Sequence, residues 1–219
     1  MFIACRACAA DHVRFSADRL ALRAVGLFRD VCGPAPGGGA VAALTAAQGA
    51  ALIMMVANLT IGKKKYAEYE ELNIGARDEA RTYLEQLMKG VDEDKEAFEQ
   101  VSKAYSMAKQ TDSEKAARRE AIAIASVGAA DAPLKLMRAG VCALRLAADM
   151  IGKSNANLVS DLYVAALNLN AGVQAASYNV AANIPYIADR ELAASWGAEA
   201  GELAGAAAEL AGQILDAGN

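Results

Sequence analysis

A long uncharged segment dominates the first third of the chain. No Asp, Glu, Lys or Arg occurs between Val31 and Gly62, and the part from about Ala40 to Thr60 consists mainly of Ala, Val, Leu, Ile and Met. This pattern predicts a helix that is apolar on all sides. Two environments suit such a helix, a membrane or the middle of a helical bundle. Gln48, Asn58 and the many small residues favour the bundle, because lipid-facing helices usually contain more Leu, Ile and Phe.

Apolar residues recur at helical spacing along most of the remaining chain, and no segment alternates as a strand does. Pro133 is expected to kink or divide one of these helices, and Pro185 suits the first turn of another. The predicted fold is therefore all-α, a helical bundle around a central buried Ala-rich helix. We expect a single domain over residues 1–219, of which 1–15 are the atypical or disordered part. Further helices are expected over residues 16–32, 66–89, 91–109, from caps at 111–113 to 153, 157–183 and 185–217.

The helix expected after residue 156 contains an unusual polar stripe. Asp161 is its only charged residue, whereas solvated helix faces normally contain several Glu, Lys and Arg residues. The stripe also borders an apolar line formed by Leu162, Leu169, Val173 and Val180. A cleft-lining or buried stripe is favoured over a solvated face, because Asn has poor helix propensity. Its members lie within about 40° of one line at 100° per residue: Asn157, Asp161, Asn168, Asn179 and Asn183.

Asp94 is a second polar residue at an apolar position. Phe98, Val101 and Tyr105 follow it four, seven and eleven residues later, on the same side of the predicted helix. Desolvation there would raise the pKa of the carboxyl and suit acid-base chemistry near neutral pH. An alternative is an Asp near a helix start that interacts with the helix dipole. The pattern alone leaves both interpretations open.

Two short motifs flank the uncharged helix. Gly37, Gly38 and Gly39 precede it, and they match neither a P-loop nor the spaced dinucleotide fingerprint. They either present bare backbone N–H groups to a flat or anionic ligand or allow close helix packing. A lysine triplet, residues 63–65, follows the helix. It is either a solvated connection or a binding site for an anion.

Composition and charge narrow the choice of partners. The net charge is -4 and the pI is near 5.2, which gives no electrostatic reason to expect nucleic acid or an anionic membrane. Four scattered cysteines fit a reducing cytoplasm. Cys5, Cys8 and His12 form a cluster, but no fourth ligand lies nearby, so we expect no metal site.

Several motifs together resemble one family. They are PAPGGGAVAAL at 34–44, MVANLTIGKKKYAEYEEL at 55–72, DEDKEAF at 92–98, EKAARREAIAIA at 114–125, Ala132-Pro133-Leu134, and SDLYVAALNLNAGVQAASYNVAANI at 160–184. The chain resembles the cyclodeaminase and methenyltetrahydrofolate cyclohydrolase family, over roughly residues 30–190. This domain also forms the C-terminal half of formiminotransferase-cyclodeaminase. The resemblance implies an all-helical subunit, a homodimer or dimer-based oligomer, and a folate groove near the glycines.

The resemblance also implies a reaction, the hydrolysis of 5,10-methenyltetrahydrofolate to 10-formyltetrahydrofolate. The 219 residues contain no formiminotransferase domain, which favours this cyclohydrolase over a 5-formiminotetrahydrofolate cyclodeaminase that releases ammonia. A non-catalytic folate-binding or assembly protein is the third hypothesis. No cofactor beyond the tetrahydrofolate substrate is expected, and no metal.

The expected roles follow from the family chemistry. Asp94 is the first candidate for proton transfer, and Asp161 would orient the substrate or balance its cationic centre. The three glycines would supply backbone donors. Hydrogen bonds to the pterin ring are expected from Asn58, Asn179 and Asn183, and contacts with the glutamate-tail carboxylates from Lys63, Lys64 and Lys65.

Overall fold

The computed structural model describes residues 37–217, and this part of the chain is helical without strands. The all-α prediction is therefore confirmed for it. The helix expected over 16–32 and the cluster of Cys5, Cys8 and His12 lie outside the described residues. Five long helices and three short 3-10 segments follow one another in this order: α2 (Gly38–Asn58), η1 (Lys64–Tyr69), α3 (Glu70–Ser106), α4 (Asp112–Met150), η2 (Ala156–Leu158), α5 (Val159–Asn183), η3 (Ile184–Tyr186) and α6 (Arg190–Asp216).

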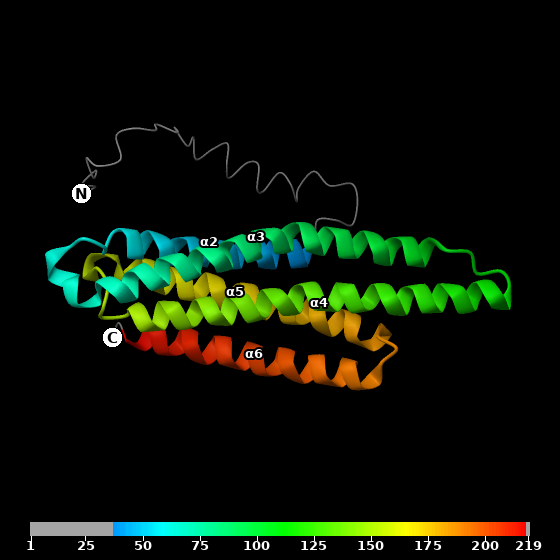
Figure 1. Ribbon diagram of the computed structural model, residues 1–219. Coiled ribbons are helices and arrows are strands. Elements are labelled where there is room, and N and C mark those ends of the chain that lie inside the picture. The colour runs from blue at the N-terminus through cyan, green and yellow to red at the C-terminus, as the bar shows by residue number, and fades with distance from the viewer. Residues whose placement is uncertain (1–36, 218–219) are drawn as a thin grey trace, which may run out of the picture. The chain divides into compact units, whose positions relative to one another are not determined.

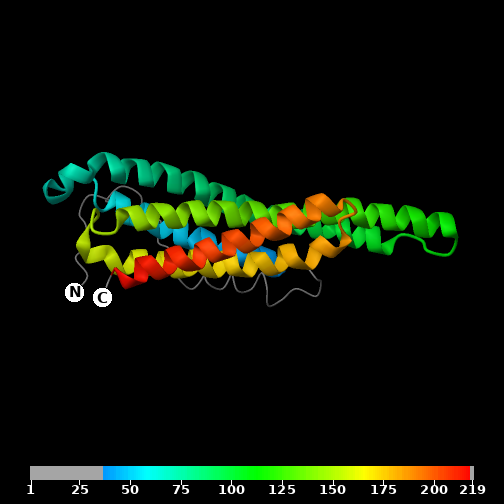
Figure 2. The same cartoon turned by 90° about the horizontal axis from the view of Figure 1, so that it is seen from below.

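Four of the long helices pack side by side in a closed order. α2 contacts α3 and α5, and α4 contacts the same two helices on the opposite side. α6 packs against α5 and α4, as Figure 1 shows. The hairpin of α3 and α4 extends beyond the other helices in both views (Figures 1 and 2). Asp94 of α3 contacts the first turn of α2, so about the first two thirds of α3 lie beside α2 and the last third projects past its start.

α2 packs through small side chains. Eleven of its 21 residues are buried, and nine of these eleven are Ala or Gly. Its length and mean hydropathy of 1.9 match those of a membrane-spanning helix, and it is the one such helix within residues 37–217. Its inner side nevertheless packs against protein, where Ile53 and Val56 are fully buried.

Glycines let α2 and α5 approach within backbone contact. A Cβ on Gly49 would lie 2.6 Å from Cγ of Leu169, and a Cβ on Gly172 would lie 2.8 Å from the carbonyl oxygen of Ala42. Real Cβ atoms do not occur at such distances, so any side chain at these two positions would push the helices apart. Gly38 lies near Asn179 and Gly49 near Leu169, so the two helices run antiparallel.

Three predicted boundaries differ from the structure. The helices expected over 66–89 and 91–109 form one helix, α3, with Gly90 in its interior, where an added Cβ would make an ordinary 3.7 Å contact with Cβ of Ala43. α4 continues through Pro133 as one 39-residue helix, so Pro133 does not divide it. Pro185 lies in the short segment η3, and the last helix starts at Arg190 after the cap Asp189. The cap at Thr111 is confirmed as a capping box with Glu114.

A hydrogen bond from α5 explains how α4 tolerates its proline. Pro133 has no N–H, so the carbonyl of Ala129, four residues earlier, lacks its normal helical donor. Nδ2 of Asn183 donates to this carbonyl at 3.2 Å. The same amide nitrogen also donates to the carbonyl of Asn179 at 2.9 Å. Asn183 thus replaces the hydrogen bond that Pro133 removes.

Substitution of Gly172 by Ala is expected to reduce the free energy of unfolding by about 1–3 kcal/mol, because the added methyl group overpacks the contact with α2. Gly205→Ala is the matched control, since Gly205 is a helical glycine of α6 with no atom within 4 Å of its Cβ position. This control should stabilise the protein by about 0.5–1 kcal/mol. Urea unfolding measures both, and equal effects would contradict the close packing.

A double-mutant cycle tests the bond between Asn183 and Ala129. Asn183→Ala should cost about 1–2 kcal/mol, because it leaves the Ala129 carbonyl without a donor. In a Pro133→Ala background the new N–H can supply that donor, so the same substitution should cost less, with a coupling of about 1 kcal/mol. An identical cost in both backgrounds would show that Asn183 acts elsewhere.

Candidate active site

The carboxylate of Asp94 joins α3 to the start of α2. The N–H of Ala40 donates to Oδ2 of Asp94 at 3.0 Å. The first turn of α2 contains no acidic residue, and its N-cap, Gly37, has no side chain that could accept a hydrogen bond. Asp94 therefore acts as the cap and as the negative partner of the helix dipole, from a neighbouring helix.

Gly39 makes this contact possible. A Cβ on Gly39 would overlap Oδ1 of Asp94 and lie 2.5 Å from Cγ. Gly38 faces a different residue, because its Cβ position is 3.8 Å from Oδ1 of Asn179. The second interpretation of the glycines, close helix packing, thus holds for Gly39. The other interpretation, that the glycines present backbone N–H groups to a ligand, also fits, because the first N–H groups of a helix have no intrahelical acceptor.

Asp94 has an altered acidity. The side chain is half-buried, and this burial raises the pKa of its carboxyl above the ordinary value of 3.8. The hydrogen bond from Ala40 opposes the shift and is the weaker cause. Within residues 37–217 no Lys or Arg forms an ion pair with Asp94. Both interpretations of its position hold, since it is a desolvated carboxylate and a partner of a helix start.

The polar stripe borders the core as predicted at Asp161, Asn168, Asn179 and Asn183 of α5, which are partly buried, whereas Asn157 lies in η2 and is exposed. Leu162, Leu169, Val173 and Val180 are fully buried, and Asn179 and Asn183 are partly buried. Nδ2 of Asn179 donates to the carbonyl of Ala175 at 3.0 Å. Its Oδ1 and its second N–H form no hydrogen bond with the described residues.

Asn183 departs from its expected role. Both hydrogens of its amide nitrogen bind backbone carbonyls, those of Ala129 and Asn179. They are therefore not free to bind a pterin ring. Asn183 instead ties the end of α5, the helix of Asn179, to α4.

The remaining predicted residues lie at the opposite end of α2. Asn58 ends this helix, and Lys63, Lys64 and Lys65 follow it. Twenty-one residues at a rise of about 1.5 Å place this end roughly 30 Å from the glycines. Asp161 precedes Asn179 by 18 positions on α5, which is about 27 Å. Within one chain, neither Asp161 nor the lysines share a groove with Asp94.

A buried hydrogen-bond network at the lysine end was not predicted. The N–H of Asn155 donates to Oγ1 of Thr60 at 2.9 Å, and the N–H of Ala156 donates to the hydroxyl of Tyr66 at 2.9 Å. Thr60, Asn155 and Tyr66 are all buried. Nζ of Lys65 lies 5.3 Å from the centre of the Tyr66 ring. This network fixes the segment that contains the lysines, and its partners are too far apart in the chain to be recognised from local pattern.

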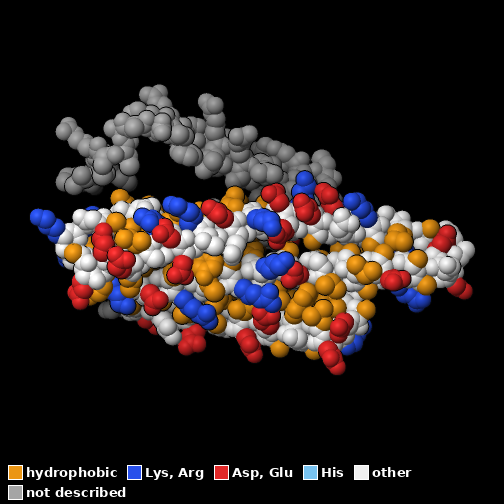
Figure 3. Space-filling view, in the orientation of Figure 1, with side chains coloured by type: hydrophobic (Ala, Val, Ile, Leu, Met, Phe, Trp, Pro, Cys, Tyr) orange, Lys and Arg blue, Asp and Glu red, His pale blue; other side chains and the backbone are white. Residues whose placement is uncertain are grey.

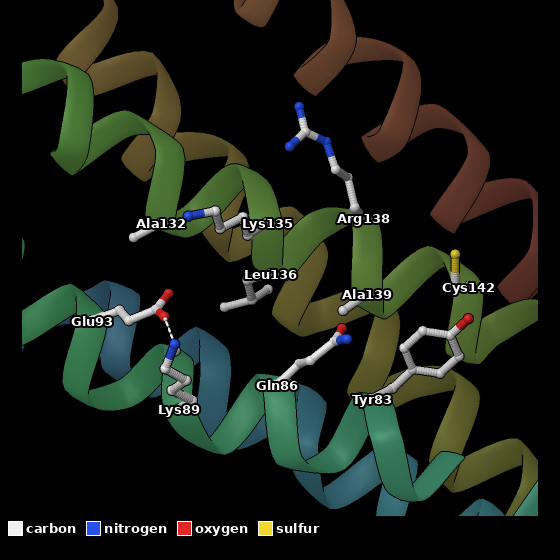
Figure 4. Close-up of a pocket in the computed structure, with 11 residues that line it drawn as sticks. Tyr83, Gln86, Lys89, Glu93, Ala132, Lys135, Leu136, Arg138, Ala139 and Cys142 are labelled. Atoms are coloured by element: carbon white, nitrogen blue, oxygen red, sulfur yellow. Dashed lines mark ion pairs between the residues drawn. The ribbon is translucent and has the colours of Figure 1, made fainter. Parts of the chain in front are cut away.

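A pocket between α3 and α4 was also missed. Its volume is about 440 Å³, and Figure 4 shows Tyr83, Gln86 and Glu93 on α3 opposite Lys135 and Cys142 of α4. Each cation at the pocket has a carboxylate partner: Lys89 with Glu93 at 2.9 Å, Lys135 with Asp131 at 2.6 Å and Arg138 with Glu199 at 2.6 Å. The spacing of three and four between Tyr83, Gln86, Gly90 and Glu93 could have indicated this face.

The sequence of residues 32–202 matches the profile of the family described as formiminotransferase-cyclodeaminase. The chain belongs to this family. Asp94, Ala40 and the three glycines at 37–39 lie within the matched region. A methenyltetrahydrofolate cyclohydrolase of Methylorubrum extorquens is 42% identical over 160 residues, which cover 73% of this chain and 77% of that relative.

Longer members of the formiminotransferase-cyclodeaminase family match as well. The mouse formimidoyltransferase-cyclodeaminase is 33% identical over 155 residues, which cover 71% of this chain and 29% of the mouse protein. The crystal structure of formiminotetrahydrofolate cyclodeaminase from Thermotoga maritima superposes with a TM-score of 0.80 at 26% identity. The superposition covers 92% of this chain and 96% of that one.

The pKa of Asp94 predicts a pH effect on stability. Because its pKa in the folded protein exceeds 3.8, ionisation of Asp94 opposes folding, and this cost is absent below pH 3.8 and complete above the folded pKa. Asp94→Asn keeps an acceptor for Ala40 and cannot ionise. The variant should therefore gain stability relative to the parent as the pH rises through this range. Urea unfolding between pH 4 and 8 measures the difference, and a relative loss with rising pH would contradict the desolvation.

Proposed function

We propose that the protein hydrolyses 5,10-methenyltetrahydrofolate to 10-formyltetrahydrofolate. The observation that supports this most directly is a half-buried carboxylate, Asp94, with a raised pKa beside a glycine-rich helix start. The 42% identity to the Methylorubrum extorquens cyclohydrolase supports the same reaction.

Asp94 is the proposed general base. Water adds to the methenyl carbon between N5 and N10, and Asp94 takes one of its protons, which gives a neutral tetrahedral carbon bearing a hydroxyl group. The C–N5 bond then breaks as N5 receives that proton and the hydroxyl loses its own to solvent, which leaves the formyl group on N10. One water is consumed and one proton released. A pKa raised toward neutral pH suits a group that must accept and return a proton.

The start of α2 would bind the hydroxyl oxygen of the tetrahedral carbon, which gains electron density as the hydroxyl loses its proton. The N–H groups of Gly38 and Gly39 have no intrahelical acceptor, whereas that of Ala40 binds Asp94. Fixed backbone donors at a helix N-terminus stabilise such an oxygen without reorganisation. Asn179, beside Gly38, has a side-chain carbonyl and one N–H that bind no residue within 37–217, and these would bind the edge of the pterin ring.

The charge of the substrate also suits Asp94. The methenyl carbon belongs to a cationic amidinium, and a partly desolvated carboxylate stabilises a cation better than a solvated one does. We propose that the reaction needs no metal and no cofactor besides the tetrahydrofolate substrate. We further propose a homodimer with α2 at its centre, a cytoplasmic location, no nucleic-acid or membrane partner, and one domain over residues 1–219.

A 5-formiminotetrahydrofolate cyclodeaminase is the second candidate. The superposition on the Thermotoga maritima cyclodeaminase favours it. In that reaction N10 attacks the formimino carbon and ammonia leaves, and Asp94 would transfer the protons. Both reactions pass through a tetrahedral carbon between the same two nitrogens, so one site can serve either.

The ultraviolet band of 5,10-methenyltetrahydrofolate distinguishes the candidates. The protein should accelerate loss of this band and should release no ammonia from 5-formiminotetrahydrofolate. Asp94→Asn should lower kcat by about 10²–10⁴-fold. The acid limb of the parent's pH profile should lie above pH 3.8, because activity requires the ionised carboxyl, and this limb should be missing in the variant. Ammonia release would instead support the cyclodeaminase, and unchanged turnover in Asp94→Asn would remove the proposed base.

A further inference from the structure

The side of α3 that holds Asp94 continues past the start of α2. Phe98, Val101 and Tyr105 follow Asp94 at helical spacing, within about 40° of its direction at 100° per residue. α2 begins beside Asp94 and runs toward the start of α3, so it does not cover these three side chains. Phe98 and Val101 are partly buried, and Tyr105 is 44% exposed. An apolar and aromatic surface therefore extends from the candidate active site along the projecting part of α3.

Tyr186 of η3 meets the far end of this surface. Its hydroxyl lies against that of Tyr105, and the pKa of Tyr105 is raised above 10 by partial desolvation and by this neighbour. Tyr186 is 51% exposed, so the two rings remain accessible although their hydroxyl groups meet. α3 packs on α2 and α4, whereas η3 packs on α4, α5 and α6, so the tyrosines join two separate sides of the bundle. We name Phe98, Tyr105 and Tyr186 the aromatic row.

Arg118 of α4 holds a positive charge at the far end of the aromatic row. Its Nε and Nη2 both donate to the carbonyl oxygen of Tyr105 at 3.2 Å, and its Cζ lies 5.2 Å from the centre of the Tyr105 ring. Within residues 37–217 Arg118 forms no ion pair with a carboxylate. A guanidinium has five N–H donors, and two of them bind this carbonyl, so three are available to an anion.

The end of the α3–α4 hairpin is positively charged, unlike the chain as a whole. Residues 103–119 contain five basic and two acidic side chains, whereas the net charge of the chain is -4. Both acidic side chains have partners, because Glu114 accepts from two backbone N–H groups and Asp112 pairs with Lys115 at 2.9 Å. Apolar side chains are exposed among the charged ones on this part of the hairpin (Figure 3). Such a surface attracts a ligand that is aromatic at one end and anionic at the other.

We propose that the aromatic row binds the p-aminobenzoyl ring of the folate and that Arg118 binds the carboxylate of the glutamate that follows. This inference rests on the proposed function, because N10 of the proposed substrate carries this ring. Asp94 and Tyr105 are 11 positions apart on α3, which is about 16 Å. From N10 to the first glutamate carboxylate is roughly 10 Å at ordinary bond lengths. With the methenyl carbon beside Asp94, the remaining length is that of the Arg118 side chain and its contact.

Arg118 suits the first glutamate better than the lysine triplet of the same chain does. The triplet lies at the other end of α2, roughly 30 Å from the glycines, which is too far for this part of the ligand. The planar guanidinium can also bind a carboxylate through two parallel hydrogen bonds, which a lysine cannot do. The carbonyl and the ring of Tyr105 already restrict the Arg118 side chain, so less conformational freedom is lost when the ligand binds.

Two ligands that differ only in the glutamate test Arg118. They are 5-formyltetrahydrofolate and 5-formyltetrahydropteroate, which lacks the glutamate, and calorimetry measures their Kd values without turnover. The parent should bind the first about 10–100-fold more tightly than the second. Arg118→Ala should abolish this difference and leave the Kd of the pteroate unchanged, which also shows that the variant is folded. Arg119→Ala is the matched control, because it removes an exposed charge from the neighbouring position and should bind both ligands as the parent does.

The aromatic row is tested with the same two ligands. Tyr105→Ala removes the ring and should raise the Kd of both ligands by about 3–10-fold, because both contain the p-aminobenzoyl ring. Tyr105→Phe keeps the ring and loses only the hydroxyl that meets Tyr186, so it should bind both ligands as the parent does. Parent-like binding by Tyr105→Ala would overturn the role of the row.

The outcomes for Arg118→Ala separate this inference from the proposed function. If the preference for the glutamate form survives in this variant, or if both ligands weaken equally, Arg118 does not bind the carboxylate. The proposed reaction is unaffected by that result as long as the parent hydrolyses 5,10-methenyltetrahydrofolate. If the preference disappears as expected but the parent hydrolyses nothing, the binding site stands and the reaction fails. A parent that binds neither ligand would overturn both proposals.

Discussion

The approach of α2 to the backbones of its neighbours is the constraint on which the rest of the structure depends. Gly49 and Gly172 allow α2 to lie against α5, and Gly39 allows the carboxylate of Asp94 to reach the first turn of α2. The same closeness removes Asp94 from water, which raises its pKa. The burial that costs stability at neutral pH thus also prepares the carboxyl for proton transfer, and helix packing and proposed chemistry have one cause.

The centres of most long helices could be predicted from the sequence, because apolar spacing reports a buried side directly, but two of the expected helices form the single helix α3. Boundaries failed where a neighbouring helix compensates for a local breaker. Gly90 suggested an interruption, yet it lies in the interior of α3 against Ala43. Pro133 suggested a break, yet Asn183 supplies the missing donor from α5. This hydrogen bond is not visible in local sequence, because Asn183 and Ala129 are 54 residues apart.

The residues of the candidate site could likewise be predicted only in part from the sequence. Asp94 could be recognised because a carboxylate at an apolar helical position needs a partner, and its partner proved to be the start of α2. Asn179 followed from its place beside the buried line of α5. Asn183 lies in the same polar stripe, but its amide donates to the Ala129 carbonyl of α4, and periodicity alone cannot reveal this. The lysines could have been placed far from Asp94 by helix rise, since α2 separates them from the glycines within one chain.

The uncharged character of α2 has two different origins on its two sides. On the inner side, Ala and Gly are required by the close contacts with α3 and α5. Among residues 37–217 no such contact explains the outer side, where Val41, Leu44 and Met55 remain at least partly exposed. A helix at the surface of a lone subunit would tolerate Lys or Glu at these positions, because exposed charges cost nothing there. Exclusion of charge from both sides is expected if a second apolar surface covers the outer one, as it would in the proposed homodimer with α2 at its centre. The pattern that resembles a membrane span is then the pattern of a helix at the centre of a dimer.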